Sequence, residues 1–308
     1  TETKRPVSWQ SATNLFEEYI ERKAGTEMVF DNKQGDTVTG SDPHRFAEDY
    51  GKKQYAKLKD LERGVQREYG KSLHTAMLTL TASATPNGEH LPPVDHLDEL
   101  LASWDAVRRE LDRVLEDRRY ARLAILEPHP SDGDNNGYLH IHVAVFMQGY
   151  VPPEAFERVY DAHVRNCDFA KKQAHTTGDI DVRHTGLDRG EMAQMNHSQA
   201  EGYSYSSESI GNLACYLAEY LGTYDDPLDQ PEHVKAANAV LWATGRQRWR
   251  PGSTAQEFMK YDGPDDPLKS EWEFVGIKDS EGEIHPVRDD DDESDGCSYL
   301  FETAPPPD

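Results

Sequence analysis

The chain has 308 residues, a formal net charge of −24 and 36% hydrophobic residues. This length allows one domain of up to about 200 residues with flanking elements. No apolar run approaches the roughly 20 residues that span a bilayer, and residues 1–6 lack the apolar stretch of a signal peptide. The three cysteines are widely spaced and form no CxxC pair, which is typical of a reducing compartment. We therefore expect a soluble, cytoplasmic protein with no membrane partner.

The strong acidity would ordinarily disfavour a nucleic-acid partner, because phosphate contacts need lysine and arginine. The chain has only 14 lysines beside 19 arginines, and its carboxylates are spread along the sequence. This pattern is typical of proteins adapted to molar salt, where the Debye length falls to about 3 Å and distant charges are screened. Local basic clusters remain at Lys171-Lys172, at Arg108-Arg109 and in residues 246–250. The net charge therefore does not exclude DNA.

Hydrophobic periodicity predicts the elements of the first half of the chain. Helices are expected at residues 11–23 and 45–69, with a Gly- and Asp-rich loop at 31–42 between them. A strand at 75–81 precedes an amphipathic helix at 95–117. Strands at 120–126 and 139–146 follow, joined by a turn at 128–137 that is rich in Gly, Asp, Asn and Pro.

In the second half, Pro152 and Pro153 mark the start of a helix that continues to about Cys167. A strand is expected at 179–184, and a helix at 209–221 ends before Gly222. A helix at 231–243, a hairpin around 279–283 and an acidic, Pro-rich tail complete the predicted elements.

The order β-α-β, β-α-β predicts an α+β protein with a ferredoxin-like antiparallel sheet and helices on one face. The expected domains are a helical N-terminal extension at 1–70, a core at 71–225, a C-terminal helix and hairpin at 226–288, and a disordered tail at 289–308.

Two histidines in one predicted strand are the strongest functional signal. His140 and His142 stand in the run Tyr138-Leu139-His140-Ile141-His142-Val143-Ala144-Val145-Phe146. Alternate strand residues point to the same face, so the two imidazoles lie about 7 Å apart along the strand and can share a metal ion.

A third ligand is expected from the preceding strand. That strand ends in Glu127, and antiparallel pairing with the histidine strand would bring Glu127 against His140. A carboxylate with two histidines would leave positions open for a substrate phosphate. His129 is the competing third ligand. The nitrogen ligands favour manganese over magnesium, and both ions remain candidates.

Two tyrosines also stand out, Tyr216 and Tyr220 in the run Tyr216-Leu217-Ala218-Glu219-Tyr220. Their i, i+4 spacing puts them on one face of the predicted helix. A tyrosine hydroxyl, with a pKa near 10, needs activation or a polarised target to act as a nucleophile. A metal site with such a pair can nick nucleic acid, whereas the alternative interpretation is an apolar helix that buries both rings.

Three elements stand in fixed order: Leu78-Thr79-Leu80-Thr81, His140-Ile141-His142, and Tyr216 with Tyr220. Over roughly residues 73–222 the chain resembles the HUH endonucleases that initiate rolling-circle replication. More narrowly, it resembles the two-tyrosine Rep proteins of haloarchaeal plasmids and viruses.

The resemblance implies that His140, His142 and Glu127 bind a divalent metal and that Tyr216 and Tyr220 are the nucleophiles. It also implies that the protein nicks and joins single-stranded origin DNA through a 5′-phosphotyrosine intermediate. A DNA hairpin can present such a single strand. Host replication proteins are further candidate partners. A transposase or relaxase of the same fold remains an alternative, as does a non-catalytic DNA-binding protein that controls a replicon.

A basic and aromatic segment lies outside the matched region, at Arg246-Gln247-Arg248-Trp249-Arg250. Arginines around a tryptophan combine phosphate contacts with a stacking surface, so Arg246, Arg248, Trp249 and Arg250 are candidate DNA-binding residues. The alternative is an edge strand in which Trp249 fills a gap in the core.

Overall fold

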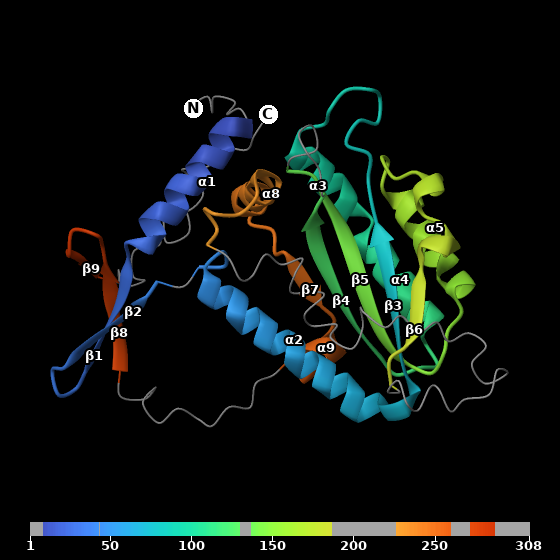
Figure 1. The fold of residues 1–308 in the computed structure, drawn as a ribbon, viewed down its shortest axis with the longest axis horizontal. Coiled ribbons are helices and arrows are strands. Elements are labelled where there is room, and N and C mark those ends of the chain that lie inside the picture. The colour runs from blue at the N-terminus through green and yellow to red at the C-terminus, as the bar shows by residue number, and fades with distance from the viewer. Residues whose placement is uncertain (1–8, 43, 130–136, 187–225, 260–271, 287–308) are drawn as a thin grey trace.

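The computed structural model describes residues 9–42, 44–129, 137–186, 226–259 and 272–286. Within them the chain forms two antiparallel sheets with helices around them (Figure 1). The larger sheet has five strands and the smaller has four. The protein is thus a mixed α+β structure. Among the described helices, none is long and apolar enough to cross a bilayer.

The larger sheet has the order β6-β3-β5-β4-β7, and every pair in it is antiparallel. Its strands are β3 (Leu73–Leu80), β4 (Tyr120–Pro128), β5 (Leu139–Gln148), β6 (Asp181–His184) and β7 (Trp249–Pro251). Helices α3 (Pro93–Ala102) and α4 (Trp104–Val114) connect β3 to β4, and α5 (Glu157–Asn166) lies between β5 and β6. The predicted strands and the β-α-β, β-α-β order of elements are therefore confirmed.

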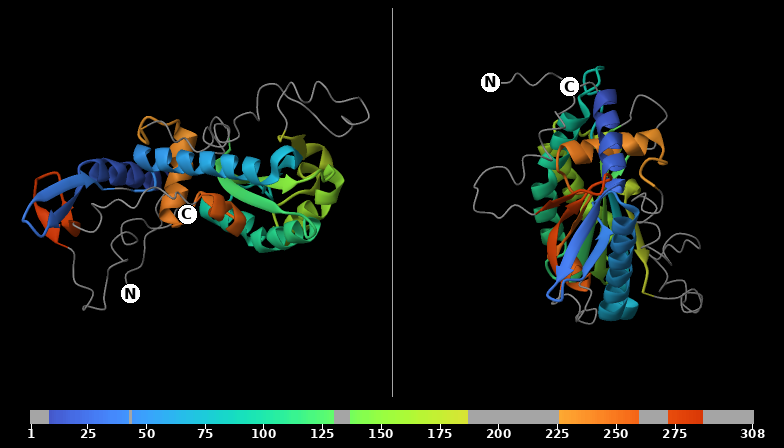
Figure 2. Two further views of the ribbon diagram at one scale, coloured as in Figure 1. Left: turned by 90° about the horizontal axis from the view of Figure 1, so that it is seen from below. Right: turned by 90° about the vertical axis from the view of Figure 1, so that its left-hand side faces the viewer.

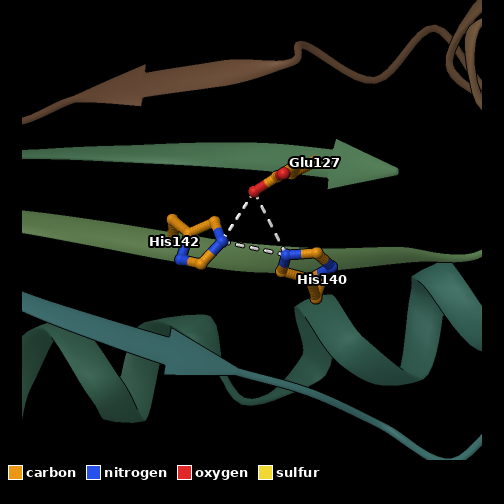
Figure 3. A group of neighbouring side chains, drawn as sticks. All are labelled: Glu127, His140 and His142. Carbon is orange, nitrogen blue, oxygen red and sulfur yellow. Dashed lines mark hydrogen bonds and ion pairs between the residues drawn. The ribbon is translucent and has the colours of Figure 1, made fainter. Parts of the chain in front are cut away.

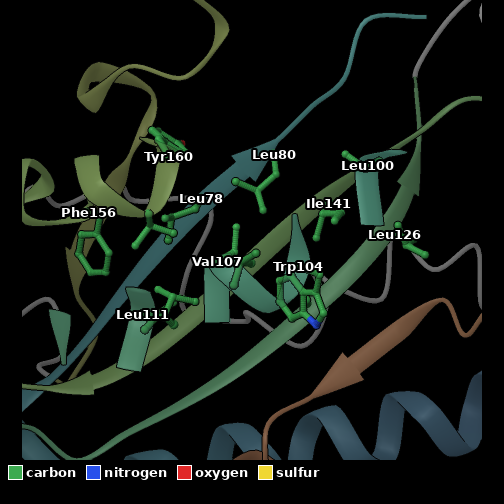
Figure 4. Packing of buried hydrophobic residues seen from close by; sticks show 14 of the residues in the cluster. Leu78, Leu80, Leu100, Trp104, Val107, Leu111, Leu126, Ile141, Phe156 and Tyr160 are labelled. Carbon is green, nitrogen blue, oxygen red and sulfur yellow. The ribbon is translucent and has the colours of Figure 1, made fainter. Parts of the chain in front are cut away.

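One face of this sheet packs against α3, α4 and α5. Because side chains alternate along a strand, Leu78 and Leu80 of β3 face these helices together with Ile141 of β5 (Figure 4). The helices contribute side chains such as Leu100 and Leu111, which are fully buried. This face forms the largest hydrophobic core of the described residues.

The opposite face is also covered, by α2 (Glu48–Tyr69) and α9 (Ser253–Phe258). Figure 2 shows α2 on one side of the sheet and α4 on the other. Leu61 and Val65 of α2 pack on Leu123 and Phe146 of the sheet. The expectation of helices on one face is therefore wrong: α2, which was predicted as part of a separate extension, completes a second hydrophobic core.

The contact between α2 and α9 depends on Gly64. A Cβ atom at this position would lie 2.7 Å from the ring of Phe258, which is too close for two carbon atoms. The glycine therefore lets α9 pack directly against α2.

The smaller sheet adds two strands to the N-terminal region, which was expected to consist of helices and a loop. It has the order β2-β1-β8-β9, formed by β1 (Glu27–Asn32), β2 (Thr37–Ser41), β8 (Trp272–Lys278) and β9 (Ile284–Pro286). Residues 31–42, expected as a loop, thus hold one end of β1 and all of β2. The predicted hairpin around residues 279–283 is confirmed as the turn between β8 and β9.

Two further helices pack against each other. Helix α1 (Trp9–Ala24) packs against α8 (Glu232–Ala243) through Phe16, Tyr19 and Trp242. Both helices agree closely with the predicted ranges.

The helix expected at residues 95–117 is divided into α3 and α4 at Ser103. The Ser103 hydroxyl contacts the carbonyl oxygen of Leu100 at 3.1 Å and Nδ1 of His163 at 2.7 Å. The hydrophobic periodicity continues across this position, which is why the sequence did not reveal the break.

Candidate metal centre

Two neighbouring strands bring the predicted ligands together. In the register of β4 and β5, Glu127 lies opposite His140 and Ile125 lies opposite His142. All three candidate ligands are on the sheet face that α2 and α9 cover, because Leu123, Ile125 and Phe146 share that face. The antiparallel register thus places one carboxylate and two imidazoles at the same end of the sheet.

The ligand atoms of these residues converge on one point (Figure 3). Nε2 of His142 lies 2.6 Å from Oε2 of Glu127, and Nε2 of His140 lies 3.2 Å from the same oxygen. The two Nε2 atoms are 2.9 Å apart.

These separations fit one face of an octahedral metal site. Neighbouring ligands of an octahedral ion with metal–ligand distances near 2.1 Å are about 3.0 Å apart. The three atoms could therefore hold a divalent ion with little movement. Two histidines and one carboxylate on one face leave the remaining positions for water or a substrate oxygen.

Burial and charge suit a cationic ligand. Glu127 and His140 are buried, and His142 is partly buried. Burial by itself would raise the pKa of Glu127, but hydrogen bonds with His140 and His142 hold it below its ordinary value. The carboxyl group is therefore ionised at neutral pH and supplies a negative charge to a bound cation.

Thr79 orients one of the imidazoles. Its hydroxyl Oγ1 lies 3.0 Å from Nδ1 of His142, on the side of the ring away from Glu127. When Nδ1 carries the proton and donates to Thr79, the lone pair of Nε2 is free for a metal. The sequence singled out Leu78-Thr79-Leu80-Thr81 as a core strand, but it did not assign this role to Thr79. The strand alternation that puts Thr79 on the histidine face was the available signal.

His129, the competing third ligand, lies beside the triad and is not part of it. Its ring is 4.8 Å from the ring of His140, measured between centroids. Burial, together with the nearby His140 and His96, lowers the pKa of His129 to about 4. Nδ1 of His140 is buried and has no hydrogen-bond partner in the described part of the chain. The geometry favours Glu127 over His129 as the companion of the two histidines.

The candidate DNA-binding segment forms the edge of the larger sheet. Trp249 lies opposite Ile125 of β4, and it is partly buried against the core under α2. Arg246 is exposed and forms an ion pair of 2.8 Å with Asp98. Arg248 donates a hydrogen bond to Oδ1 of Asn238. Trp249 thus has a packing role, and whether the segment contacts DNA stays a prediction.

The predicted nucleophiles, Tyr216 and Tyr220, lie outside the described residues, as does the helix expected at residues 209–221.

A second group of possible ligands occurs in the turn between β8 and β9. It consists of Asp279, Glu283 and His285. Oδ1 of Asp279 accepts hydrogen bonds from the backbone N–H groups of Glu281 and Glu283, and its other oxygen contacts His285 at 2.7 Å. These contacts stabilise an exposed hairpin turn, which explains the cluster without a metal.

Comparison with known proteins gives one family match. The whole chain, residues 1–308, matches the family described as "Putative rep protein (DUF1424)". The chain belongs to this family. It is 41% identical over 308 residues to an "Uncharacterized 36 kDa protein" of Halobacterium salinarum, which covers 98% of this chain and 93% of that protein. It is 40% identical over 311 residues to a protein of the same description from Halobacterium sp. (strain GN101), with 98% and 92% covered.

Both relatives come from halophilic organisms, which agrees with the acidic composition of this family member. No solved structure matches the chain.

Proposed function

We propose that the protein is a metal-dependent endonuclease and strand transferase that nicks single-stranded DNA and initiates rolling-circle replication. The observation that carries this proposal is the convergence of Glu127, His140 and His142 in a protein whose family description refers to replication. A replication initiator of this kind must cut one strand and keep the energy of the broken bond for later joining. A covalent link to a tyrosine meets both requirements.

The sheet topology supports the assignment to the HUH fold. Four strands of the larger sheet have the order β6-β3-β5-β4, with the helical connections of a β-α-β-β-α-β unit. This strand order supports a ferredoxin-like arrangement as part of the proposal, and β3 and β5 are neighbours in the sheet. Thr79 of β3 therefore lies opposite His142 of β5, so that the first two matched motifs are adjacent in space.

Glu127, His140 and His142 are the residues that would hold the metal. A divalent ion bound there, Mn²⁺ or Mg²⁺, would polarise the phosphate that is cleaved. The protein contributes a pre-formed ligand set on two adjacent strands, and Thr79 fixes the orientation of His142. The carboxylate of Glu127 offsets part of the charge of the cation in this partly buried position.

Tyr216 and Tyr220 are the proposed nucleophiles. The phenolic oxygen of one tyrosine attacks the phosphorus atom, and the bond from phosphorus to the 3′ oxygen breaks. The tyrosine proton is lost and the 3′ oxygen takes up a proton, so the products are a free 3′ hydroxyl and a 5′-phosphotyrosine. The second tyrosine can then accept a second strand, which would allow cutting and joining in turn.

The net charge of −24 is compatible with this partner in molar salt. Long-range repulsion between the acidic surface and DNA is screened there. The arginines of residues 246–250 offer phosphate contacts at the edge of the sheet that carries Glu127, and these contacts weaken as the salt concentration rises.

The experiment that tests the proposal is cleavage of a random-sequence pool of single-stranded DNA in the presence of Mn²⁺ and molar salt. We expect a protein–DNA species that survives denaturing electrophoresis, and we expect EDTA to prevent its formation. His142→Ala should abolish it, whereas His90→Ala, at a histidine outside the triad, should not. A metal-independent adduct, or an adduct in His142→Ala, would show that the triad is not the metal centre.

A further inference from the structure

A pocket separates the start of α2 from α8 and β7. Its cavity volume is about 50 Å³, which is several times the 10–15 Å³ that one water molecule needs. Its lining includes Arg45, Tyr50, Gln54, Asn238, Arg246 and Arg248. The pocket therefore has room for part of a ligand, and all six of these side chains carry a polar group.

The first turns of α2 form one wall. Ala47, Tyr50, Gly51 and Gln54 line the pocket at i, i+3, i+4 and i+7, so they share one helix face. The N-cap residue, Ala47, has no side chain that could cap this helix, and the first intrahelical hydrogen bond runs from Gly51 N–H to the carbonyl oxygen of Ala47. The earlier N–H groups of the first turn have no intrahelical acceptor, and a helix N-terminus attracts anions.

Gln54 supplies an independent observation. Its side chain is 6% exposed, and its Oε1 atom has no hydrogen-bond partner among the described residues. The other buried amides of the pocket are satisfied: Asn238 donates to Gln230 at 2.9 Å and accepts from Arg248. A buried acceptor without a donor is costly. Gln54 therefore lacks an N–H or O–H group that a ligand in the pocket could bring.

The charges of the lining favour an anion. Arg45, Arg246 and Arg248 line the pocket, and Glu48 is its single described acid; Arg246 also forms an ion pair of 2.8 Å with Asp98, outside the lining. Glu48 is exposed and forms an ion pair of 2.7 Å with Lys52. Arg45 donates to the backbone carbonyl oxygens of Arg246 and Leu241, so its guanidinium group is held at the pocket.

The pocket adjoins the metal centre along the edge of the sheet. The backbone N–H of Leu126 donates to the carbonyl oxygen of Arg248 at 2.7 Å. Glu127 is the next residue of β4, and adjacent strands are separated by about 4.8 Å. A strand of DNA at the triad could thus extend over β7 towards the pocket.

We propose that this pocket binds one nucleotide of the single-stranded DNA, with its base hydrogen-bonded to Gln54. The phosphate group lies against the arginines and the N-terminus of α2, and a base N–H group donates to Oε1 of Gln54. The pocket thereby selects a base close to the cleavage point. This inference rests on the proposed function for the identity of the ligand, but its test does not depend on cleavage.

The test measures binding of short fluorescent oligonucleotides in EDTA, so that no cleavage occurs. The probes are homopolymers of deoxyadenosine, deoxycytidine and thymidine, with an abasic oligonucleotide of equal length. We expect at least one homopolymer to bind more tightly than the abasic strand. Gln54→Leu should weaken that binding roughly 5- to 10-fold, the loss of one hydrogen bond, and leave abasic binding unchanged. Gln66→Leu, at an exposed glutamine of the same helix, should have no effect.

The thermal stability of Gln54→Leu shows whether Oε1 of Gln54 faces a ligand site or already bonds to another group of the protein. Leucine removes a buried unpaired acceptor, so Gln54→Leu should unfold at the same or a higher temperature. Lower stability would mean that Oε1 already has a partner inside the protein, and it would overturn the inference. Unchanged affinity in Gln54→Leu, or equal binding of all homopolymers and the abasic strand, would overturn it as well.

The phosphate contact has its own control pair. Arg246→Gln should weaken binding of every probe, including the abasic strand, and lower the salt slope by about one phosphate contact. Arg63→Gln, at an exposed arginine of α2, should not. An unchanged affinity in Arg246→Gln would exclude a phosphate at this position.

The two proposals can fail separately. If the protein never cleaves DNA but Gln54→Leu still loses base-dependent binding, the nucleotide pocket is supported and the nuclease proposal fails. If the protein cleaves DNA but Gln54→Leu binds it as tightly as the wild type does, only the pocket is rejected.

Discussion

The substitution Thr79→Val isolates the residue that orients His142. Valine has nearly the shape of threonine and also favours strands, so the change should leave β3 intact. It removes the hydroxyl that lies 3.0 Å from Nδ1 of His142. The proton is then no longer held on Nδ1 by this contact, and fewer molecules present the lone pair of Nε2 to a metal.

Loss of an outer contact of this type weakens metal binding by roughly 10- to 100-fold, or about 1.4 to 2.7 kcal/mol. The assay is isothermal titration calorimetry with Mn²⁺ at constant salt. Each variant should also be checked by thermal unfolding, because a lost hydrogen bond costs about 1 kcal/mol of stability.

Thr75→Val is the matched control. Thr75 lies on the same face of β3, is buried, and has its hydroxyl 2.9 Å from that of Thr185. This substitution should lower stability to a similar extent and leave the affinity for Mn²⁺ unchanged. Equal affinities of wild type and Thr79→Val, or equal losses in the two variants, would refute the orienting role of Thr79.

Three further predictions concern the ligand set, the acid range and the edge strand. Glu127→Ala should weaken Mn²⁺ binding in calorimetry, whereas His129→Ala should not; the opposite result would make His129 the third ligand. Burial lowers the pKa of His163 to about 4 from its ordinary 6.5. Between these two pH values His163 is protonated in the unfolded chain but not in the folded protein, so the free energy of unfolding should fall as the pH drops from 6.5 towards 4. His163→Gln should reduce that slope by about 1 kcal/mol per pH unit in denaturant unfolding, and an unchanged slope would exclude this histidine as its source. Trp249→Ala should lower the melting temperature because Trp249 packs under α2. If the variant also binds single-stranded DNA more weakly in molar salt, Trp249 stacks on a base as well; if its DNA affinity is unchanged, the role of Trp249 is structural.

The central part of the fold could be predicted because local signals determine it. Only ten residues separate the strands at 120–128 and 139–148, fewer than a crossover between parallel strands needs, so antiparallel pairing is expected. Alternation along each strand then decides which side chains share a face. These two rules were enough to place Glu127 against His140, and the structure has this pairing.

The smaller sheet could not be predicted because its pairing is between distant parts of the chain. Strand β1 pairs with β8, near the other end of the sequence. The segment that forms β2 is polar and largely exposed, so it lacks the alternation that identifies a half-buried strand. Its strand conformation depends on pairing with β1 and not on its own composition.

The position of α2 was missed for a related reason. The periodicity of residues 45–69 predicts a helix with one apolar face, but it does not say which surface that face covers. Contacts with Leu123 and Phe146 decide this, and they come from the sheet. The role of α2 as the cover of the second face follows only from the tertiary structure.

Within the candidate site, the chemistry of the three ligands could be inferred from residue type and spacing. The role of Thr79 could not, because it depends on a contact with His142, far along the chain. The role proposed for Gln54 could not either, because it depends on the lack of a partner for Oε1 among the described residues.

The most direct measurement for the central claim is mass spectrometry of the protein after reaction with single-stranded DNA and Mn²⁺. Nuclease digestion of the bound DNA should leave a peptide with a 5′-linked nucleotide on Tyr216 or Tyr220, and the double variant with Phe at both positions should yield none. A DNA-linked peptide elsewhere in the chain, or cleavage that persists in the double variant, would contradict the proposed nucleophiles.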